Sequence, residues 1–216
     1  PLSSAQKRLF VINQMEGIGI GYNVPAVLLV EGELSPYKLE EMFIELINRH
    51  EALRTSFEIV EGEPVQKIHS EFDFSIEYME ASEEDAPAYI EEFIRPFDLE
   101  KAPILRVGLM KMAEERHLLM IDMHHIVTDG VSIGVIIKEI ALLYQGVELP
   151  QLRIQYKDYS GWHNGLLASG KIKEQEEYWL NVFEDEIPVL QMPTDYPRAA
   201  LQSMEGSTFS FELEKD

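Results

Sequence analysis

The segment of residues 118–132 constrains the fold more than any other part of the sequence. It begins with an apolar run of the length and composition of a buried strand, and His124 and His125 stand at the end of that run. A Thr-Asp-Gly turn follows, and then a periodic apolar pattern that predicts a helix. The segment therefore predicts a strand, a turn and a helix in succession, an arrangement in which rigid elements present two titratable side chains.

The rest of the chain alternates between helical and strand-like periodicity, which predicts an α/β protein. In the helix after the histidines, an apolar stripe predicts packing on a sheet and leaves Lys138 and Glu139 outside the stripe. Further helices are expected at residues 3–12, 36–50, 82–94, 156–168 and 172–183. Strands are expected at residues 24–30, 64–68, 72–78, 103–110, 117–123 and 208–213. Residues 49–57 are expected to lead into a further strand, which a turn at 61–63 joins to 64–68 as a hairpin.

The charge balance disfavours two classes of partner. The chain has 18 Lys and Arg against 39 Asp and Glu, a formal charge of −21, which repels nucleic-acid phosphates and anionic lipids. It contains no cysteine, which excludes disulfides, thiolate catalysis and cysteine-ligated metals. No apolar run approaches the roughly 20 residues that span a bilayer. We therefore expect no nucleic-acid or membrane partner and a cytoplasmic location.

The two histidines point to proton-transfer chemistry. Alternation along a strand places His124 on the face of Asp122 and His125 on the opposite face. Only one of them then points into a given cleft, which disfavours joint binding of one metal ion. A histidine can accept a proton from an attacking amine or hydroxyl, or hold the nucleophile, and general bases typically contribute about 10²–10⁴-fold to a rate.

The turn residues support such a site, but a structural interpretation is open. Asp129 can anchor the turn by binding a buried arginine, and Gly130 lets the backbone bend or approach a substrate. The same spacing also fits two core histidines with satisfied hydrogen bonds and Asp129 as the N-cap of the next helix.

Residues 123–132 resemble the HHxxxDG signature of condensation domains from nonribosomal peptide synthetases, which are relatives of chloramphenicol acetyltransferase. Other segments are similar to motifs of the same family in the same order. These segments are residues 4–10, 49–57, 95–99, 156–162 and 193–198. The resemblance extends over essentially the whole chain but covers only the first half of a condensation domain, because the later family motifs are missing.

The resemblance implies an α/β fold with a mixed sheet packed with helices, as a single lobe of a chloramphenicol acetyltransferase-like two-lobed fold. Residues 1–185 are expected to form the N-terminal condensation-domain lobe. Residues 186–216 are expected to form an extended linker and strand leading toward a C-terminal lobe that this chain lacks. The chain also begins at Pro1 rather than methionine, so we expect it to be part of a larger protein.

The activity that the resemblance implies is acyl transfer that forms a peptide bond, as in antibiotic biosynthesis. An amino group carried on one phosphopantetheine arm attacks an aminoacyl or peptidyl thioester carried on another. The implied partners are the upstream and downstream peptidyl carrier domains, the missing C-terminal lobe and an adenylation domain. We expect no cofactor or metal bound by this lobe, and little or no activity of the lobe by itself, because two tethered substrates need both walls of the site.

The resemblance also implies roles for individual residues. His125 is expected to be the catalytic base or the residue that positions the amine, and these two roles stay open. His124 and Asp129 are expected to hold the turn, with Gly130 beside the reaction centre. We further predict an ion pair between Asp129 and Arg54 that supports the site, motivated by the need of a buried carboxylate for a partner. Arg49 is expected to be a cation at a helix C-terminus.

Two other functions remain as alternatives. The chain could be a non-catalytic module that docks carrier domains. It could also be an epimerisation-type relative, although Ile133 stands where those domains usually have tryptophan. Turnover by the intact domain distinguishes catalysis from docking.

Overall fold

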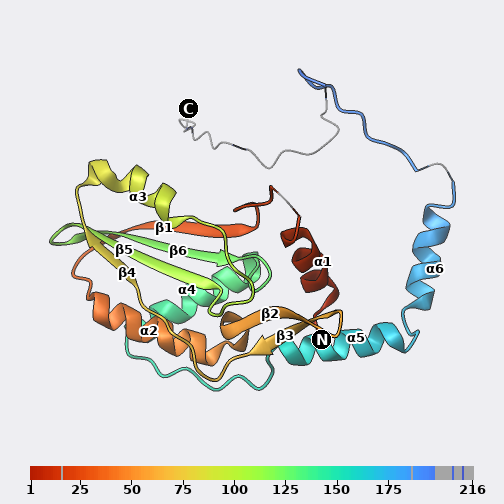
Figure 1. The fold of residues 1–216 in the computed structure, drawn as a ribbon, viewed down its shortest axis with the longest axis horizontal. Helices are drawn as coiled ribbons and strands as arrows, with labels where there is room; N and C mark the ends of the chain where they lie inside the picture. Colours follow the sequence, from red (N-terminus) through yellow and green to blue (C-terminus); the bar gives the residue numbers. More distant parts are fainter. Residues whose placement is uncertain (16, 186, 198–205, 207–210, 212–216) are drawn as a thin grey trace, which may run out of the picture. The chain divides into compact units, whose positions relative to one another are not determined.

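The computed structural model describes residues 1–15, 17–185, 187–197, 206 and 211 (Figure 1). The chain divides into two compact units, Pro1–Lys171 and Ile172–Asp216. The second unit contains helix α6 (Lys173–Val182) and an extended segment after it. The division into a lobe and a linker at residue 185 stays a prediction, and all of the strand expected at 208–213 except Phe211 lies outside the described residues.

The first unit is built on a four-stranded sheet. In spatial order its strands are β1 (Asn23–Glu31), β6 (Arg116–His124), β5 (Leu105–Ala113) and β4 (Glu77–Glu80). β4 runs parallel to β5, and the other neighbours are antiparallel. The sheet is therefore mixed, which confirms the predicted fold class. Its β4 overlaps the strand expected at 72–78 only at residues 77 and 78 and continues to Glu80, because the pairing with β5 begins at Glu77.

Helices cover both faces of this sheet (Figure 1). The helices of the first unit are α1 (Ser4–Asn13), α2 (Pro36–Arg49), α3 (Ala86–Phe93), α4 (Gly130–Tyr144) and α5 (Tyr156–Ala168). Helices α2 and α4 pack on one face and α3 on the other. No described helix combines the length and the apolar character that crossing a bilayer requires.

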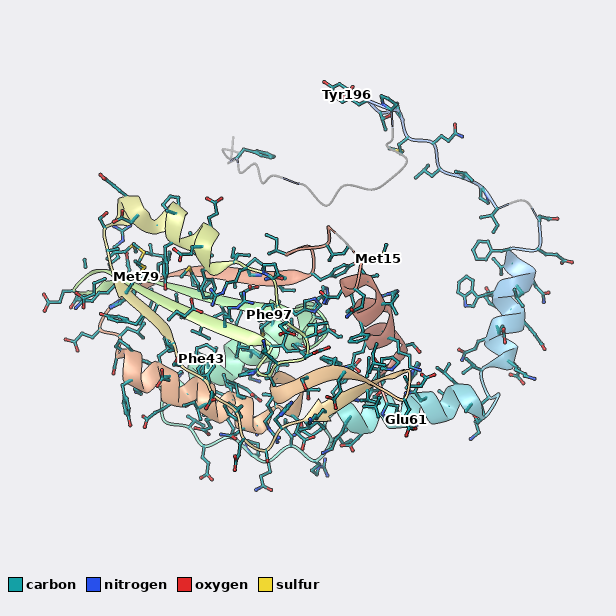
Figure 2. All side chains as sticks on the ribbon, in the orientation of Figure 1. Met15, Phe43, Glu61, Met79, Phe97 and Tyr196 are labelled. Carbon is teal, nitrogen blue, oxygen red and sulfur yellow. The ribbon has the colours of Figure 1, made fainter. Side chains whose placement is uncertain are left out.

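Alternate residues of β6 belong to two hydrophobic cores, one on each face of the sheet. Leu119, Ile121 and Met123 face α2 and α4, where they join Phe43, which points from α2 toward the sheet (Figure 2). The residues between them on β6 face α3, where Met120 packs against the fully buried ring of its Phe93. Because both faces of β6 are covered, its last residue is held by packing on two sides.

A separate two-stranded hairpin lies beside α1. Its strands β2 (Thr55–Val60) and β3 (Glu63–Ile68) follow a short 3₁₀ turn, η1 (Glu51–Arg54). Phe57 of β2 is fully buried in a small core with Phe10 of α1 and Ile126 of the turn after β6. This core positions α1 against the segment that contains the two histidines.

Candidate active site

His124 is the last residue of β6 and is buried, with 2% of its surface exposed. Its Nδ1 accepts a hydrogen bond from the backbone N–H of Ile126 at 3.1 Å, so the neutral ring carries its proton on Nε2. The ring lies between Tyr22 and Phe97, with centroid separations of 6.3 and 6.4 Å. Burial, and to a smaller extent the charge of His125, lowers the pKa of His124 to about 4. His124 is therefore uncharged at neutral pH.

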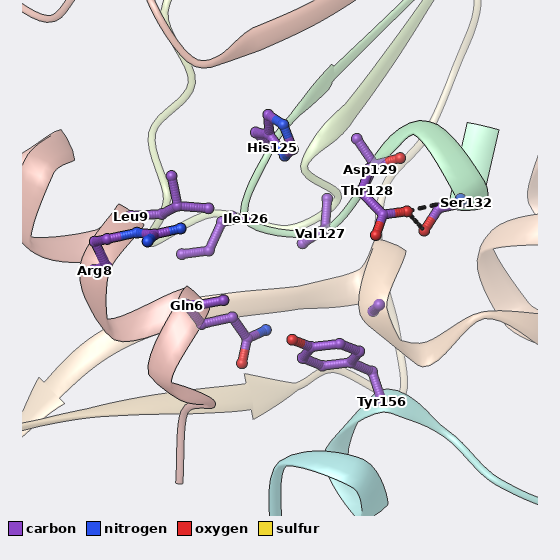
Figure 3. Close-up of a pocket in the computed structure, with 12 residues that line it drawn as sticks. Gln6, Arg8, Leu9, His125, Ile126, Val127, Thr128, Asp129, Ser132 and Tyr156 are labelled. Atoms are coloured by element: carbon purple, nitrogen blue, oxygen red, sulfur yellow. Dashed lines mark hydrogen bonds between the residues drawn. The ribbon is translucent and has the colours of Figure 1, made fainter. Parts of the chain in front are cut away.

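His125 is exposed and lies in the turn after β6. Its backbone N–H donates to the carbonyl of Tyr22 at 2.8 Å, which continues the pairing of β6 with the segment before β1. Its side chain lines a cavity of about 220 Å³ between α1, the turn and the start of α5 (Figure 3). The other lining residues are Ala5, Gln6, Arg8, Leu9, Ala52, Ile126, Val127, Thr128, Asp129, Ser132 and Tyr156.

Asp129 is exposed and is the N-cap of α4. Its Oδ1 accepts hydrogen bonds from the backbone N–H and the hydroxyl of Ser132, at 2.8 and 2.7 Å. These bonds from Ser132 lower the pKa of the Asp129 carboxyl. Gly130 then begins the helix, and a Cβ at this position would meet no atom within 4 Å. The room that Gly130 leaves for a substrate thus stays a prediction.

The predicted ion pair between Asp129 and Arg54 is wrong. Arg54 Nη2 lies 3.7 Å from Glu51 Oε1, and its Nη1 donates to the carbonyl of His69 at 2.5 Å. The expectation assumed a buried carboxylate, whereas Asp129 is exposed and satisfied by Ser132. Arg54 instead ties η1 to the end of the β2–β3 hairpin.

Glu139 was expected outside the apolar stripe of α4, but only 8% of it is exposed. Its two carboxylate oxygens lie 3.0 Å from Arg49 Nε and 2.5 Å from His50 Nε2. Arg49 does lie in the last turn of α2, as predicted for a C-terminal cation, and it also forms this pair with Glu139. The sequence signal was the spacing of Ile136, Glu139 and Leu143, which places all three on one buried helical face.

Another buried carboxylate was also missed. Asp122 is fully buried on β6, on the same face as His124, and lies 3.2 Å from Arg106 Nη1. Burial raises the pKa of Asp122 to about 6, and its hydrogen bond from Asn23 and the charge of Arg106 only partly offset this effect. Its signal was one aspartate within an otherwise apolar run. Within the described residues, no three His, Asp or Glu side chains come close enough together to hold a metal ion.

The burial of His124 makes its own contribution to the stability of the fold depend on pH. Its pKa is about 4 in the folded protein and 6.5 as a model value, so the unfolded chain binds more protons between these values. The contribution of uncharged His124 to the free energy of unfolding is fully present above about pH 6.5. It is lost as the pH falls to about 4, and the loss amounts to about 3 kcal/mol. Asp122, with its raised pKa, opposes this trend over much of the same range. The two effects partly cancel in the wild type.

Chemical denaturation from pH 4 to 7 separates the two contributions. The stability difference between wild type and His124→Gln should become more favourable to the wild type by about 3 kcal/mol as the pH rises from 4 to 7. A difference that stays constant with pH would show that His124 does not titrate as the structure indicates.

Comparisons with known proteins agree on one family. A family model described as "Condensation domain" matches residues 1–216. The chain is 56% identical over 211 residues to Gramicidin S synthase 2 of Brevibacillus brevis, an alignment that covers 98% of this chain and 5% of the relative.

Solved structures show the same fold. The X-domain in its complex with OxyB from teicoplanin biosynthesis has a TM-score of 0.84 at 28% identity, over 94% of this chain and 47% of that one. The first condensation domain of the calcium-dependent antibiotic synthetase, in complex with a substrate analogue, has a TM-score of 0.73 at 21% identity, over 87% of this chain and 48% of that one.

Proposed function

The chain belongs to the condensation-domain family, and on this premise we propose that it is the N-terminal part of a domain that forms amide bonds between carrier-bound substrates. The acceptor amine attacks the carbonyl carbon of the donor thioester, so that a C–N bond forms and the C–S bond breaks. The amine loses one proton, and the departing thiolate gains one. His125 is the residue that we assign to this proton or to the orientation of the amine.

The observation that carries this proposal is the contrast between the two histidines. His125 is exposed beside a cavity, whereas His124 is buried and uncharged at neutral pH. A neutral neighbour does not compete for the proton, and its fixed ring supports the turn that carries His125. The site therefore presents one accessible imidazole in a fixed backbone position, which is what a general base or an amine-binding group requires.

The partners in this proposal come from outside this chain. The chain spans about 5% of the length of Gramicidin S synthase 2, and 48% of the solved condensation domain. We propose that a second lobe closes the cavity beside His125. We also propose that the phosphopantetheine arms of two carrier domains deliver the donor and the acceptor, and that an adenylation domain belongs to the same synthetase. The reducing cytoplasm is the compartment that we propose, which fits a chain without cysteine.

The test is amide formation by the natural protein that carries this chain. Donor and acceptor amino acids are loaded on separate carrier domains, and the dipeptidyl product is measured by mass spectrometry. Residues 1–216 alone are the comparison, and we expect them to yield little product, because proximity of two tethered substrates needs both walls. Equal yields from both proteins would overturn the proposal that a second lobe completes the site. No product from the natural protein would overturn the proposed amide-bond formation.

A docking module is the second candidate, favoured by one comparison. The X-domain, whose fold matches this chain with a TM-score of 0.84, was solved in complex with OxyB. A docking function predicts that carrier domains bind to the natural protein with unchanged affinity when His125 is replaced, and that no amide forms. Turnover that depends on His125 excludes this candidate as the main function.

A further inference from the structure

Beneath the two histidines lies a buried ion pair to which neither the proposed reaction nor the family motifs assign a role. We propose that Arg106 and Asp122 are positioning residues that hold the turn of His124 and His125 in its working geometry. This inference rests on the proposed function only for its kinetic consequence, because the geometry itself can be tested without turnover.

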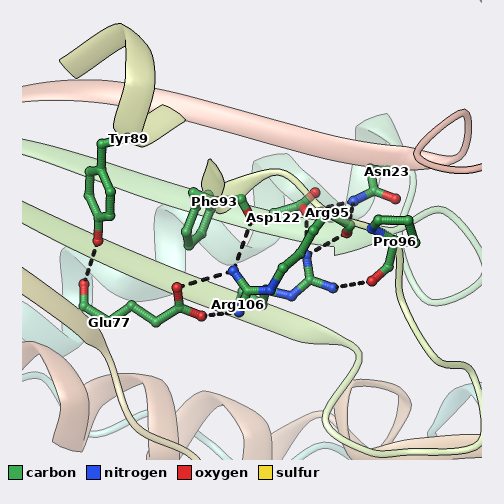
Figure 4. Close-up of polar contacts among 8 residues, drawn as sticks. All are labelled: Asn23, Glu77, Tyr89, Phe93, Arg95, Pro96, Arg106 and Asp122. Carbon is green, nitrogen blue, oxygen red and sulfur yellow. Dashed lines mark hydrogen bonds and ion pairs between the residues drawn. The ribbon is translucent and has the colours of Figure 1, made fainter. Parts of the chain in front are cut away.

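Asp122 connects three segments of the chain. It precedes His124 by two residues on the same face of β6 and is fully buried. Its Oδ2 accepts a hydrogen bond from Asn23 Nδ2 at 2.6 Å and lies 3.2 Å from Arg106 Nη1 (Figure 4). Asn23 begins β1 and Arg106 lies on β5, directly opposite Asp122 in the strand register. One carboxylate therefore joins three adjacent strands, β1, β6 and β5, at the end of the sheet that presents the histidines.

Arg106 fixes the segment that follows α3. Its Nη1 donates to the carbonyl of Arg95 at 2.6 Å and its Nη2 to the carbonyl of Pro96 at 2.8 Å. Its guanidinium carbon lies 3.7 Å from the centroid of the Phe97 ring, a cation–π contact. A planar, five-donor group can make all of these contacts at once, whereas a lysine cannot.

Both partners of Asp122 lead directly to the histidines. The Phe97 ring, held under Arg106, meets the His124 ring edge-on at 6.4 Å and 84°. Asn23 stands opposite His124 in the strand register, and the preceding carbonyl, of Tyr22, accepts the backbone N–H of His125. The position of His125 thus depends on Asp122 through the contacts of Asn23 and Tyr22. The position of His124 depends on Asp122 through the contacts of Arg106 and Phe97.

A role in geometry explains why a charge pair occupies this place. Apolar side chains of similar size generally stabilise a buried site as well as an ion pair does, so the pair is not needed for stability alone. Hydrogen bonds to a strand and to two loop carbonyls, together with the cation–π contact to the Phe97 ring, specify one arrangement, which apolar packing does less well. The charged groups near this site are Arg95 and Glu77, which pair with each other at the surface.

Carbethoxylation of histidines by diethyl pyrocarbonate, located by mass spectrometry, tests the geometry in the natural protein that carries this chain. In the wild type we expect His124 and His117 to be protected, because each is only 2% exposed. In Arg106→Met and in Asp122→Asn, labelling of His124 should rise by about tenfold or more, because the contacts that cover its ring open locally. His117 lies at the far end of β6 and should stay protected, which reports that the fold is intact.

Arg116→Met is the matched control, because Arg116 is also on β6 but pairs with the exposed Glu83. It should change the labelling of neither histidine. Protection of His124 in Arg106→Met at the wild-type level would overturn the proposal, and so would equal labelling of His124 and His117, which indicates general loosening.

The kinetic arm uses amide formation by the same proteins. Arg106→Met should lower kcat by about ten- to hundredfold with little change in KM for either carrier, because a displaced His125 affects the reaction and not the docking. Arg106→Lys should recover little of this loss. A rise in KM at unchanged kcat would overturn the positioning role. If the wild type forms no amide, the proposed function fails, whereas the labelling result still decides this inference.

Discussion

His125→Ala is expected to lower the rate of amide formation by about 10²–10⁴-fold, with little effect on folding. The side chain is exposed and only its backbone N–H, which alanine retains, is hydrogen bonded to Tyr22. The loss should therefore appear in kcat and not in the free energy of unfolding. Single-turnover product formation by the natural protein with loaded carriers measures the first, and denaturant titration measures the second.

A second substitution separates the two roles that remain open for His125. Glutamine keeps a hydrogen-bonding group but cannot take up a proton at neutral pH. If His125 positions the amine, His125→Gln should retain most of the rate, whereas a general base predicts a loss close to that of alanine. His163→Ala is the matched control, because His163 lies on α5 and does not line the cavity. Full activity of His125→Ala would remove the residue from the reaction.

The sequence predicted the local elements well, because their determinants are local. The helical stripe of α2 and the alternation of β6 follow directly from apolar spacing, and the structure forms both elements. The same alternation placed His124 and His125 in different environments, and the structure buries the first and exposes the second. The structural interpretation was right for Asp129 as an N-cap, since this cap depends only on the residues of the turn.

The side-chain pairs could not be predicted in the same way. Arg49 and Glu139 are 90 residues apart, and nothing in the local pattern of either helix identifies its partner. The predicted ion pair between Asp129 and Arg54 was wrong because Asp129 is exposed, and this exposure depends on how the turn packs in the folded protein. Asp122 and Arg106 needed the strand register, which only the folded sheet defines. Tertiary packing thus decides which charges meet, and the sequence shows only which charges stand among apolar residues.

Glu139→Ala is expected to destabilise the protein by about 3–5 kcal/mol, the effect of breaking a buried ion pair by removing one partner. The side chains of Glu139 and Arg49 are only 11% and 12% exposed, so water screens the remaining charge poorly. The substitution also removes the hydrogen bond that joins Glu139 to His50 and thereby the polar link between α4 and the end of α2. Denaturant unfolding at constant pH measures the loss, and Lys138→Ala, at the exposed neighbouring position, should change stability by no more than about 0.5 kcal/mol.

A double-mutant cycle then shows what the pair contributes. Arg49→Met combined with Glu139→Leu leaves no uncompensated charge, and apolar side chains of similar volume can fill the space between the helices. The cycle includes the single variants Arg49→Met and Glu139→Leu. We expect the double variant to be more stable than Glu139→Leu by at least about 2 kcal/mol, with a coupling energy well above the measurement error. If the double variant were as unstable as the single one, the loss would come from packing of α4 and not from the stranded guanidinium. A recovered stability would mean that the ion pair is not needed to hold the two helices together, since an apolar interface does so equally well.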